Sequence, residues 1–252
     1  MKKIAFLTAF SLVSTFYVNA QPPKTGTANN SNQKMKAAKK LPNTIATQNK
    51  KDISMETDKC IRVKITTDSG IIILKLYDST PLHRDNFVKL VKEGFYDSLL
   101  FHRVIPQFMI QGGDPLSKNA TPGTLLGGGG ADMPRIPAEF NSNYFHKKGV
   151  IAAARDNNPA KASSACQFYL VEGKVSTDAE LNQIEQYYGI KYNPEQRKIY
   201  TTIGGTPILD QNYTVFGEVE KGIEVIGKIT NVPRDSHDRP LADVRMKIEI
   251  AE

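Results

Sequence analysis

The chain is poor in the residues on which several protein classes depend. Its 252 residues include no tryptophan and only two cysteines, and charged side chains make up 23% of them. Two cysteines cannot build a disulfide scaffold or a four-cysteine zinc site. A hydrophobic content of 40% also argues against both a multi-span membrane protein and a wholly disordered chain.

The N-terminal segment has the pattern of a secretory signal peptide. Two lysines precede an apolar run over residues 4–13, which only one threonine and one serine interrupt, and small residues lead up to a cleavage site after Ala20. An uncleaved anchor helix would need about 18 clean apolar residues, and this run is too short. We therefore predict a signal peptide over residues 1–20, export to the periplasm or beyond it, and no transmembrane span once the leader is removed.

The basic charge of the chain is concentrated outside its folded part. Of the formal net charge of +7, the leader carries +2 and residues 21–58 carry +4, which leaves +1 for residues 59–252. Residues 21–58 contain almost no large apolar side chains, so we predict a disordered polar and basic linker. The folded part offers no basic excess that would indicate a nucleic-acid partner.

Residues 59–252 are predicted to form one domain of short strands. Residues 60–65 and 71–76 alternate around a turn, as in a β-hairpin, and a helix is expected from Thr80-Pro81 to Gly94, with Leu82 on its apolar face. Further strands are expected at residues 101–110, 149–154, 167–171, 213–219 and 244–250. Many strands with few helices are typical of a barrel or a sandwich.

Residues 174–206 are predicted to be a helical insertion. Ser176-Thr177-Asp178 would begin a helix that runs to Tyr188, and a second helix would begin at Pro194. Leu181, Ile184 and Tyr188 share the face expected to dock on the domain. A second hypothesis is that the insertion recruits a specific partner.

The segment from Phe101 to Asp114 concentrates the chemistry. Alternate residues of a strand share a face, so a single strand would place Arg103, Met109 and Gln111 together. Pro106 interrupts the ladder of such a strand and would reset the alternation through a bulge. The result would be a fixed cation, an adaptable apolar surface and an amide side by side.

This segment closely resembles the signature of the cyclophilin-type peptidyl-prolyl cis-trans isomerases. The string is Phe101-His102-Arg103-Val104-Ile105-Pro106-x-Phe108-Met109-Ile110-Gln111-Gly112-Gly113-Asp114. Three later blocks follow in the family's order, namely Gly149-Val150-Ile151-Ala152, Gln167-Phe168-Tyr169-Leu170, and Leu209-Asp210 with Val215-Phe216-Gly217. The resemblance spans roughly residues 60–250. It implies a mainly β fold, namely a closed eight-stranded antiparallel barrel capped by two helices. It also implies an enzyme that uses no metal or cofactor.

The resemblance also implies a site, residue by residue. The catalytic arginine falls on Arg103, and Gln111 would grip the displaced carbonyl. The substrate-binding positions fall on His102, Phe108, Met109, Ala154, Gln167, Tyr169, Leu209 and Tyr213.

Four positions depart from the family's pattern. Tyr169 stands where many members have phenylalanine, Tyr213 where many have histidine, and Arg155 where asparagine is common. Ile208 occupies the place of a tryptophan that is often linked to cyclosporin binding. These changes bear on inhibitor sensitivity and sequence preference more than on the activity.

The predicted function is isomerisation of X–Pro bonds in unfolded or exported polypeptides by a monomer that assists folding. The alternative is a non-catalytic chaperone that holds proline-containing segments. A hydrolase triad of His102, Asp114 and either Ser163 or Ser164 is disfavoured, because neither serine lies in a nucleophile elbow. Residues 127–130 are four glycines with no Lys-Ser/Thr after them, so they are not a phosphate loop.

Overall fold

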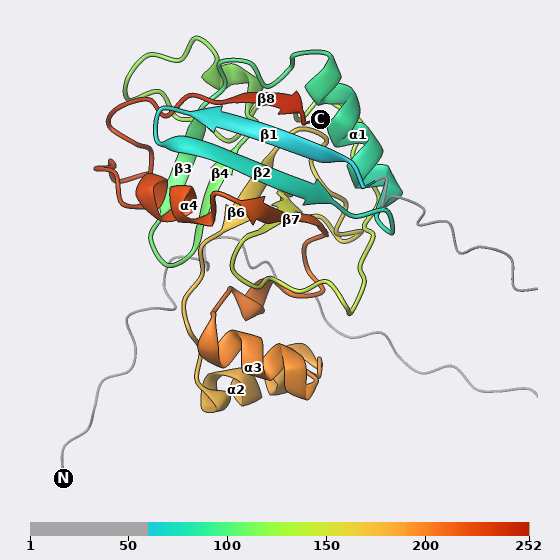
Figure 1. Cartoon of the computed structure of the whole chain (residues 1–252). Helices are drawn as coiled ribbons and strands as arrows, with labels where there is room; N and C mark the ends of the chain where they lie inside the picture. The colour runs from blue at the N-terminus through green and yellow to red at the C-terminus, as the bar shows by residue number, and fades with distance from the viewer. Residues whose placement is uncertain (1–59, 252) are drawn as a thin grey trace, which may run out of the picture. The chain divides into compact units, whose positions relative to one another are not determined.

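The computed structural model describes residues 60–251, which form eight strands, four α-helices and two short 3₁₀ helices (Figure 1). The strands are β1 (Arg62–Thr67), β2 (Gly70–Leu76), β3 (Phe101–Ile105), β4 (Met109–Gly112), β5 (Val150–Ala153), β6 (Phe168–Val171), β7 (Val215–Lys221) and β8 (Lys247–Ile250). The helices are α1 (Pro81–Lys92), α2 (Asp178–Tyr188), α3 (Pro194–Thr202) and α4 (Ile223–Thr230), with 3₁₀ helices η1 (Pro115–Ser117) and η2 (Pro207–Leu209). The predicted leader and linker lie outside the described residues. Within residues 60–251, no helix combines the length and apolar character of a membrane span.

All eight strands belong to one sheet in the order β3-β4-β6-β5-β7-β2-β1-β8, and every pair of neighbours is antiparallel. The mainly β, eight-stranded antiparallel prediction is confirmed. The expected hairpin is β1 and β2, whose ladder runs from Arg62 opposite Lys75 to Thr67 opposite Gly70.

The predicted closure of the barrel is wrong, because the sheet is an open half-barrel. Its end strands, β3 and β8, share no ladder within the described residues. The residues just before them pair only briefly, at the bridge between Leu100 and Arg245, where the Phe101 amide donates to the Val244 carbonyl and the Met246 amide to the Leu99 carbonyl. Beyond this point the Val104 amide of β3 donates to the Asp238 carbonyl at 2.8 Å, so a loop takes the edge that β8 would need.

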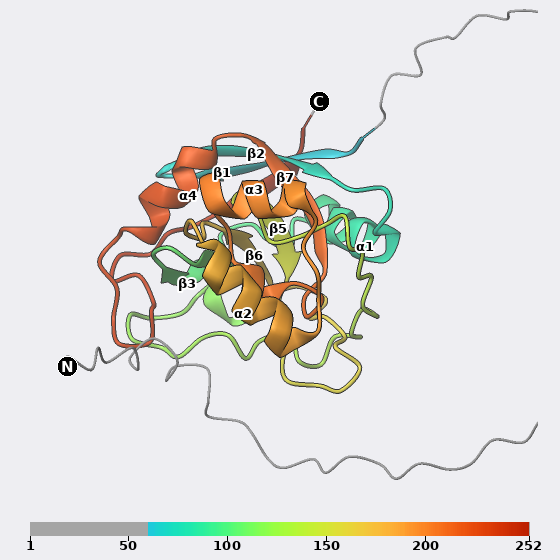
Figure 2. The same ribbon diagram turned by 90° about the horizontal axis from the view of Figure 1, so that it is seen from below.

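The inner face of the sheet and two helices enclose the main core. Strand residues such as Val104, Ile110 and Phe168 pack there against the buried faces of α1 and α4. Phe87, Leu90 and Val91 of α1 are buried, as its apolar pattern predicts. The prediction is wrong for Leu82, which is 50% exposed, while His83 is buried in its place. Figure 1 shows α1 and α4 against the strands and the pair α2 and α3 below them, and in Figure 2, seen from below, this pair lies in front of the sheet.

The insertion folds as the sequence predicts at its helix ends. Thr177 and Asn193 form capping boxes with Glu180 and Gln196, which satisfy the first amides of α2 and α3. Leu181, Tyr192 and Tyr200 form a small buried cluster of their own, and Phe145, Ile184 and Ile190 pack against it. Tyr188 is 43% exposed, so its predicted place in the docking face is wrong.

A β-bulge buries a histidine in β3. Phe101 lies opposite Gly112 and Arg103 opposite Gln111, so His102 is the extra residue on β3. Its side chain is 4% exposed and neither ring nitrogen has a hydrogen-bond partner of normal geometry. Burial lowers the pKa of His102 to about 4, and Asp114 opposes this shift while Arg103 adds to it.

This burial predicts acid sensitivity. The unfolded chain protonates His102 near pH 6.5 and the folded chain only near pH 4, so stability should fall as the pH drops through this interval. The two pKa values correspond to a loss of about 3 kcal/mol in the free energy of unfolding. His102→Gln should remove most of that part of the loss in urea titrations at pH 7, 5.5 and 4, whereas exposed His237→Gln should retain it. An unchanged acid dependence in His102→Gln would contradict a buried neutral imidazole.

Candidate active site

Arg103 and Gln111, the two residues predicted to be catalytic, lie opposite each other on the two strands of a hairpin. β3 and β4 pair with Arg103 opposite Gln111 and Ile105 opposite Met109, so the single strand predicted over residues 101–110 is wrong. The reason is a turn in which the Phe108 amide donates to the Ile105 carbonyl at 3.1 Å. Pro106 occupies its second position and its third residue has a φ of 60°, as a type II turn requires. The hairpin still brings Arg103, Met109 and Gln111 together.

A chain of amide hydrogen bonds orients Gln111. Its Nε2 donates to Gln167 Oε1 at 3.0 Å, and Gln167 Nε2 donates to the carbonyls of Gly127 and Gly129, both at 2.9 Å. Arg103 Nη1 lies 3.5 Å from Gln111 Oε1, which is the one hydrogen bond that its guanidinium makes within residues 60–251. The half-buried Arg103 therefore keeps most of its five donors for a substrate.

The apolar members of the predicted site gather on the outer face of the sheet. Because side chains alternate along a strand, this face carries the residues that the main core does not. Its buried members are Met109, Val150, Ala152, Ala154, Tyr169, Val171 and Val215, and its half-buried members include Phe108, Leu209 and Tyr213. All six apolar positions predicted to bind substrate thus lie in one cluster, which we call the outer cluster.

Two of the departures from the family's pattern change the polarity of this cluster. The Tyr169 hydroxyl lies 2.9 Å from His146 Nε2, and its ring meets that of Tyr213 edge-on at 5.9 Å. Burial raises the pKa of the Tyr169 phenol, so the hydroxyl keeps its proton. The Arg155 guanidinium lies 4.7 Å from the centre of the Tyr213 ring, which places a cation on the exposed side of the pocket.

Arg103 and Gln111 also line a hollow in the surface. His102 lines it together with residues 124–127 and Asp235, His237 and Arg239. Asp235 accepts the backbone amides of both His237 and Arg239, which fixes this loop. His102 therefore borders the hollow that Arg103 and Gln111 also line, rather than the outer cluster.

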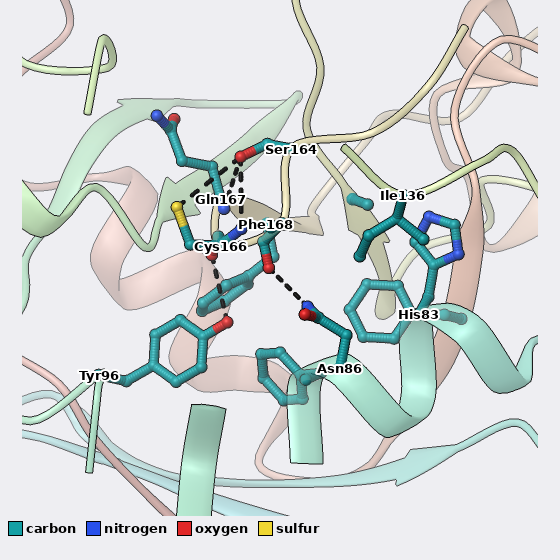
Figure 3. A pocket seen from close by; sticks show the side chains of 12 residues that line it. His83, Asn86, Tyr96, Ile136, Ser164, Cys166, Gln167 and Phe168 are labelled. Carbon is teal, nitrogen blue, oxygen red and sulfur yellow. Dashed lines mark hydrogen bonds between the residues drawn. The ribbon is translucent and has the colours of Figure 1, made fainter. Parts of the chain in front are cut away.

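The hollow in Figure 3 lies between α1 and the start of β6, and core residues such as Phe87 and Phe168 line it together with Gln167 of the predicted site. The figure shows Asn86 donating to the Ala165 carbonyl at 2.6 Å and Tyr96 donating to the Cys166 carbonyl at 3.2 Å. Cys166 is buried, and this burial raises the pKa of its thiol. These contacts join α1 to the sheet.

The structure does not assemble the alternative triad. Asp114 accepts the amides of Leu116, Gly127 and Gly129, and Ser163 faces His83 rather than His102. 

A different serine–histidine–glutamate set lies at the start of α1, where His83 Nε2 is 2.9 Å from Ser163 Oγ and His83 Nδ1 is 2.6 Å from Glu139 Oε2. Glu139 also accepts the first amides of α1, from Leu82 and His83. Ser163 is 1% exposed, so this set is closed to a substrate and holds the helix end in place.

His146 is a neighbour of the site that no sequence pattern predicts. His146 and Tyr169 are 23 residues apart, and no local pattern links them. Their contact depends on the position of β6 in the sheet, which only the complete fold provides.

Relatives of known name support the resemblance. The family description "Cyclophilin type peptidyl-prolyl cis-trans isomerase/CLD" matches residues 62–250. A Staphylococcus haemolyticus (strain JCSC1435) protein named "Putative peptidyl-prolyl cis-trans isomerase" is 35% identical over 189 residues, which cover 74% of this chain and 89% of that protein. A Staphylococcus aureus (strain USA300) protein of the same name is 34% identical over 185 residues, which cover 73% and 88%.

Solved structures show the same fold. A crystal structure of a Cryptosporidium parvum cyclophilin type peptidyl-prolyl cis-trans isomerase matches with a TM-score of 0.56 and 23% identity, and covers 77% of this chain and 98% of its own. A second structure of it, in the presence of the dipeptide Ala-Pro, matches with a TM-score of 0.54 and 22% identity over 76% and 99%. The sequence match over residues 62–250 goes beyond the fold, and this chain belongs to the cyclophilin-type peptidyl-prolyl cis-trans isomerase family.

Proposed function

We propose that Arg103 and Gln111 catalyse rotation of X–Pro bonds whose proline ring lies against the outer cluster. The observation that carries this assignment is the register of β3 and β4, which sets the two side chains opposite each other beside Met109 and Phe108. A cyclophilin-type relative studied with Ala-Pro supports a proline-containing peptide as the ligand.

The chemistry requires little more than these groups. Amide resonance imposes a rotation barrier of about 18–20 kcal/mol. In the twisted amide the proline nitrogen regains its lone pair, and Arg103 can donate to it without ever losing its own proton. Gln111, held by Gln167, is placed to bind the carbonyl as it turns. No bond is broken, so no nucleophile or proton relay is needed.

The energy must be shared between the arginine and the pocket. An acceleration of about five decades corresponds to roughly 7 kcal/mol. A hydrogen bond to a charged group contributes only about 1.5–3 kcal/mol. The remainder would come from holding the ring in the outer cluster while the amide twists, which is binding of the transition state rather than of the substrate.

The chaperone alternative is not favoured. A chaperone that only binds proline-containing segments needs the apolar outer cluster. It does not need Arg103, whose donors are mostly unengaged, placed opposite the oriented amide of Gln111. The family membership points the same way.

Arg103→Ala should lower kcat/KM for a proline tetrapeptide about 100-fold, because about 3 kcal/mol of charge-assisted hydrogen bonding is lost. Peptide binding should change far less, since the outer cluster remains. The matched control is Arg62→Ala, which removes an arginine of β1 and its 2.7 Å ion pair with Glu220 of β7. Equal kcat/KM values in Arg103→Ala and Arg62→Ala would remove Arg103 from the mechanism.

We also propose that the domain acts on exported polypeptides, as a monomer behind a cleaved leader and a polar linker. The support is the pattern of residues 1–20, with its basic start, apolar run and small residues.

Mass spectrometry of the protein recovered from the cell envelope should find Gln21 as the first residue. Ala20→Phe should block this cleavage, because leader processing requires a small residue at that position. Ala38→Phe, within the linker, is the control and should be processed normally. A wild-type chain that retains Met1 and stays in the cytoplasm would contradict export.

A further inference from the structure

A buried hydrogen-bond chain runs from the outer cluster to the insertion. The Tyr169 hydroxyl lies 2.9 Å from His146 Nε2, and His146 Nδ1 lies 2.7 Å from Asp210 Oδ1. The other oxygen of Asp210 accepts the Tyr200 hydroxyl at 2.5 Å. Tyr200 lies on α3, so four side chains connect the helical insertion with the floor of the proposed proline pocket.

The direction of each hydrogen bond follows from the chemistry of the groups. The Asp210 carboxylate only accepts, so His146 Nδ1 carries a proton. In the neutral imidazole Nε2 is then an acceptor, and Tyr169 donates to it. The four residues are between 0% and 4% exposed. A buried polar network that is fully satisfied is rigid, whereas one missing member leaves a costly unpaired group.

His146 contacts Tyr169 both at its hydroxyl, through the hydrogen bond, and at its ring, through stacking. The His146 and Tyr169 rings stack at 6.0 Å with an interplanar angle of 15°. On β6, Tyr169 is paired with Gln111 of β4, two residues from Met109. Any rotation of the phenol ring would therefore move a wall of the pocket next to the catalytic amide.

The insertion is also fixed at its base, beside the same histidine. Gly205 forms bridges with both Lys147 and Lys174, so the two ends of the insertion pair with each other and the C-terminal end also pairs with the segment that carries His146. The Thr206 amide donates to the His146 carbonyl at 2.8 Å. Asp210 follows η2, whose Leu209 packs against the outer cluster. The structure thus joins the insertion to two walls of the pocket.

We propose that Tyr200 is a positioning residue for the proline pocket, which acts through Asp210 and His146 on the ring of Tyr169. The proposal rests on the proposed isomerase function for its consequence, but the coupling itself is a property of the free protein. In this arrangement the insertion is a structural part of the active site rather than a detachable module for recruiting a partner.

Tyr200→Phe removes the α3 hydroxyl that donates to Asp210. We expect kcat/KM for a proline tetrapeptide to fall about fivefold, or about 1 kcal/mol. In the free protein the ¹³C-labelled ε-methyl group of Met109 should shift in NMR spectra, because the outer cluster repacks. In a Tyr169→Phe background the hydroxyl at the far end is absent, so adding Tyr200→Phe should produce little further loss.

Asn193→Ala is the matched control. It removes the N-cap of α3, where Asn193 accepts the Gln196 amide at 2.9 Å, and weakens the insertion without touching the four-residue chain. We expect its Met109 methyl position and its kcat/KM to match the wild type.

Two results would overturn the coupling. One is a Tyr200→Phe protein with an unshifted Met109 methyl and wild-type kcat/KM. The other is an Asn193→Ala protein that reproduces both changes, since general weakening of the insertion would then explain them. A wild-type protein without isomerase activity, but with the Met109 shift in Tyr200→Phe alone, would overturn the proposed function and uphold the coupling.

Discussion

The period-two alternation of side chains on β3, β4 and β6 is the constraint on which the rest of the structure depends. Val104, Ile110 and Leu170 point inward and belong to the main core. Their chain neighbours Arg103 and Tyr169 belong to the opposite face. A slip of one residue in any of these ladders would exchange the two faces. The register that stabilises the core therefore also places the proposed catalytic groups, and the two cannot be altered independently.

A site built in this way suits a reaction in which no bond is broken. Rotation of a peptide bond requires a cavity that fits the twisted amide and donors that stay in place while it turns. Sheet hydrogen bonds hold the backbone, and the amide chain from Gln111 through Gln167 to Gly127 and Gly129 holds the side chains. Rigidity is an advantage here, because any reorganisation of the donors would add to the barrier.

A carboxylate–histidine–hydroxyl hydrogen-bond arrangement occurs at two places in the fold. His83 joins the carboxylate of Glu139 to the hydroxyl of Ser163. His146 joins the carboxylate of Asp210 to the hydroxyl of Tyr169 in the same sense. In each case Nδ1 faces the carboxylate and Nε2 the hydroxyl, so a buried imidazole connects two distant segments. The first set fixes the start of α1, and the second fixes the insertion to the sheet.

The sequence by itself determined the features that depend on residues close together in the chain. The helix starts at Thr177 and Pro194, the hairpin of β1 and β2, and the motif string that contains Arg103 and Gln111 could all be read from the sequence, because each signal lies within a few residues. At Pro106 the sequence predicts a bulge in one strand, whereas the structure has a turn between two strands, because both features use the same residues locally. Only the tertiary structure decided that the barrel stays open and that Tyr169 meets His146 and Asp210. Those contacts join segments as much as 64 residues apart, and their distances are set by the whole sheet rather than by any local preference.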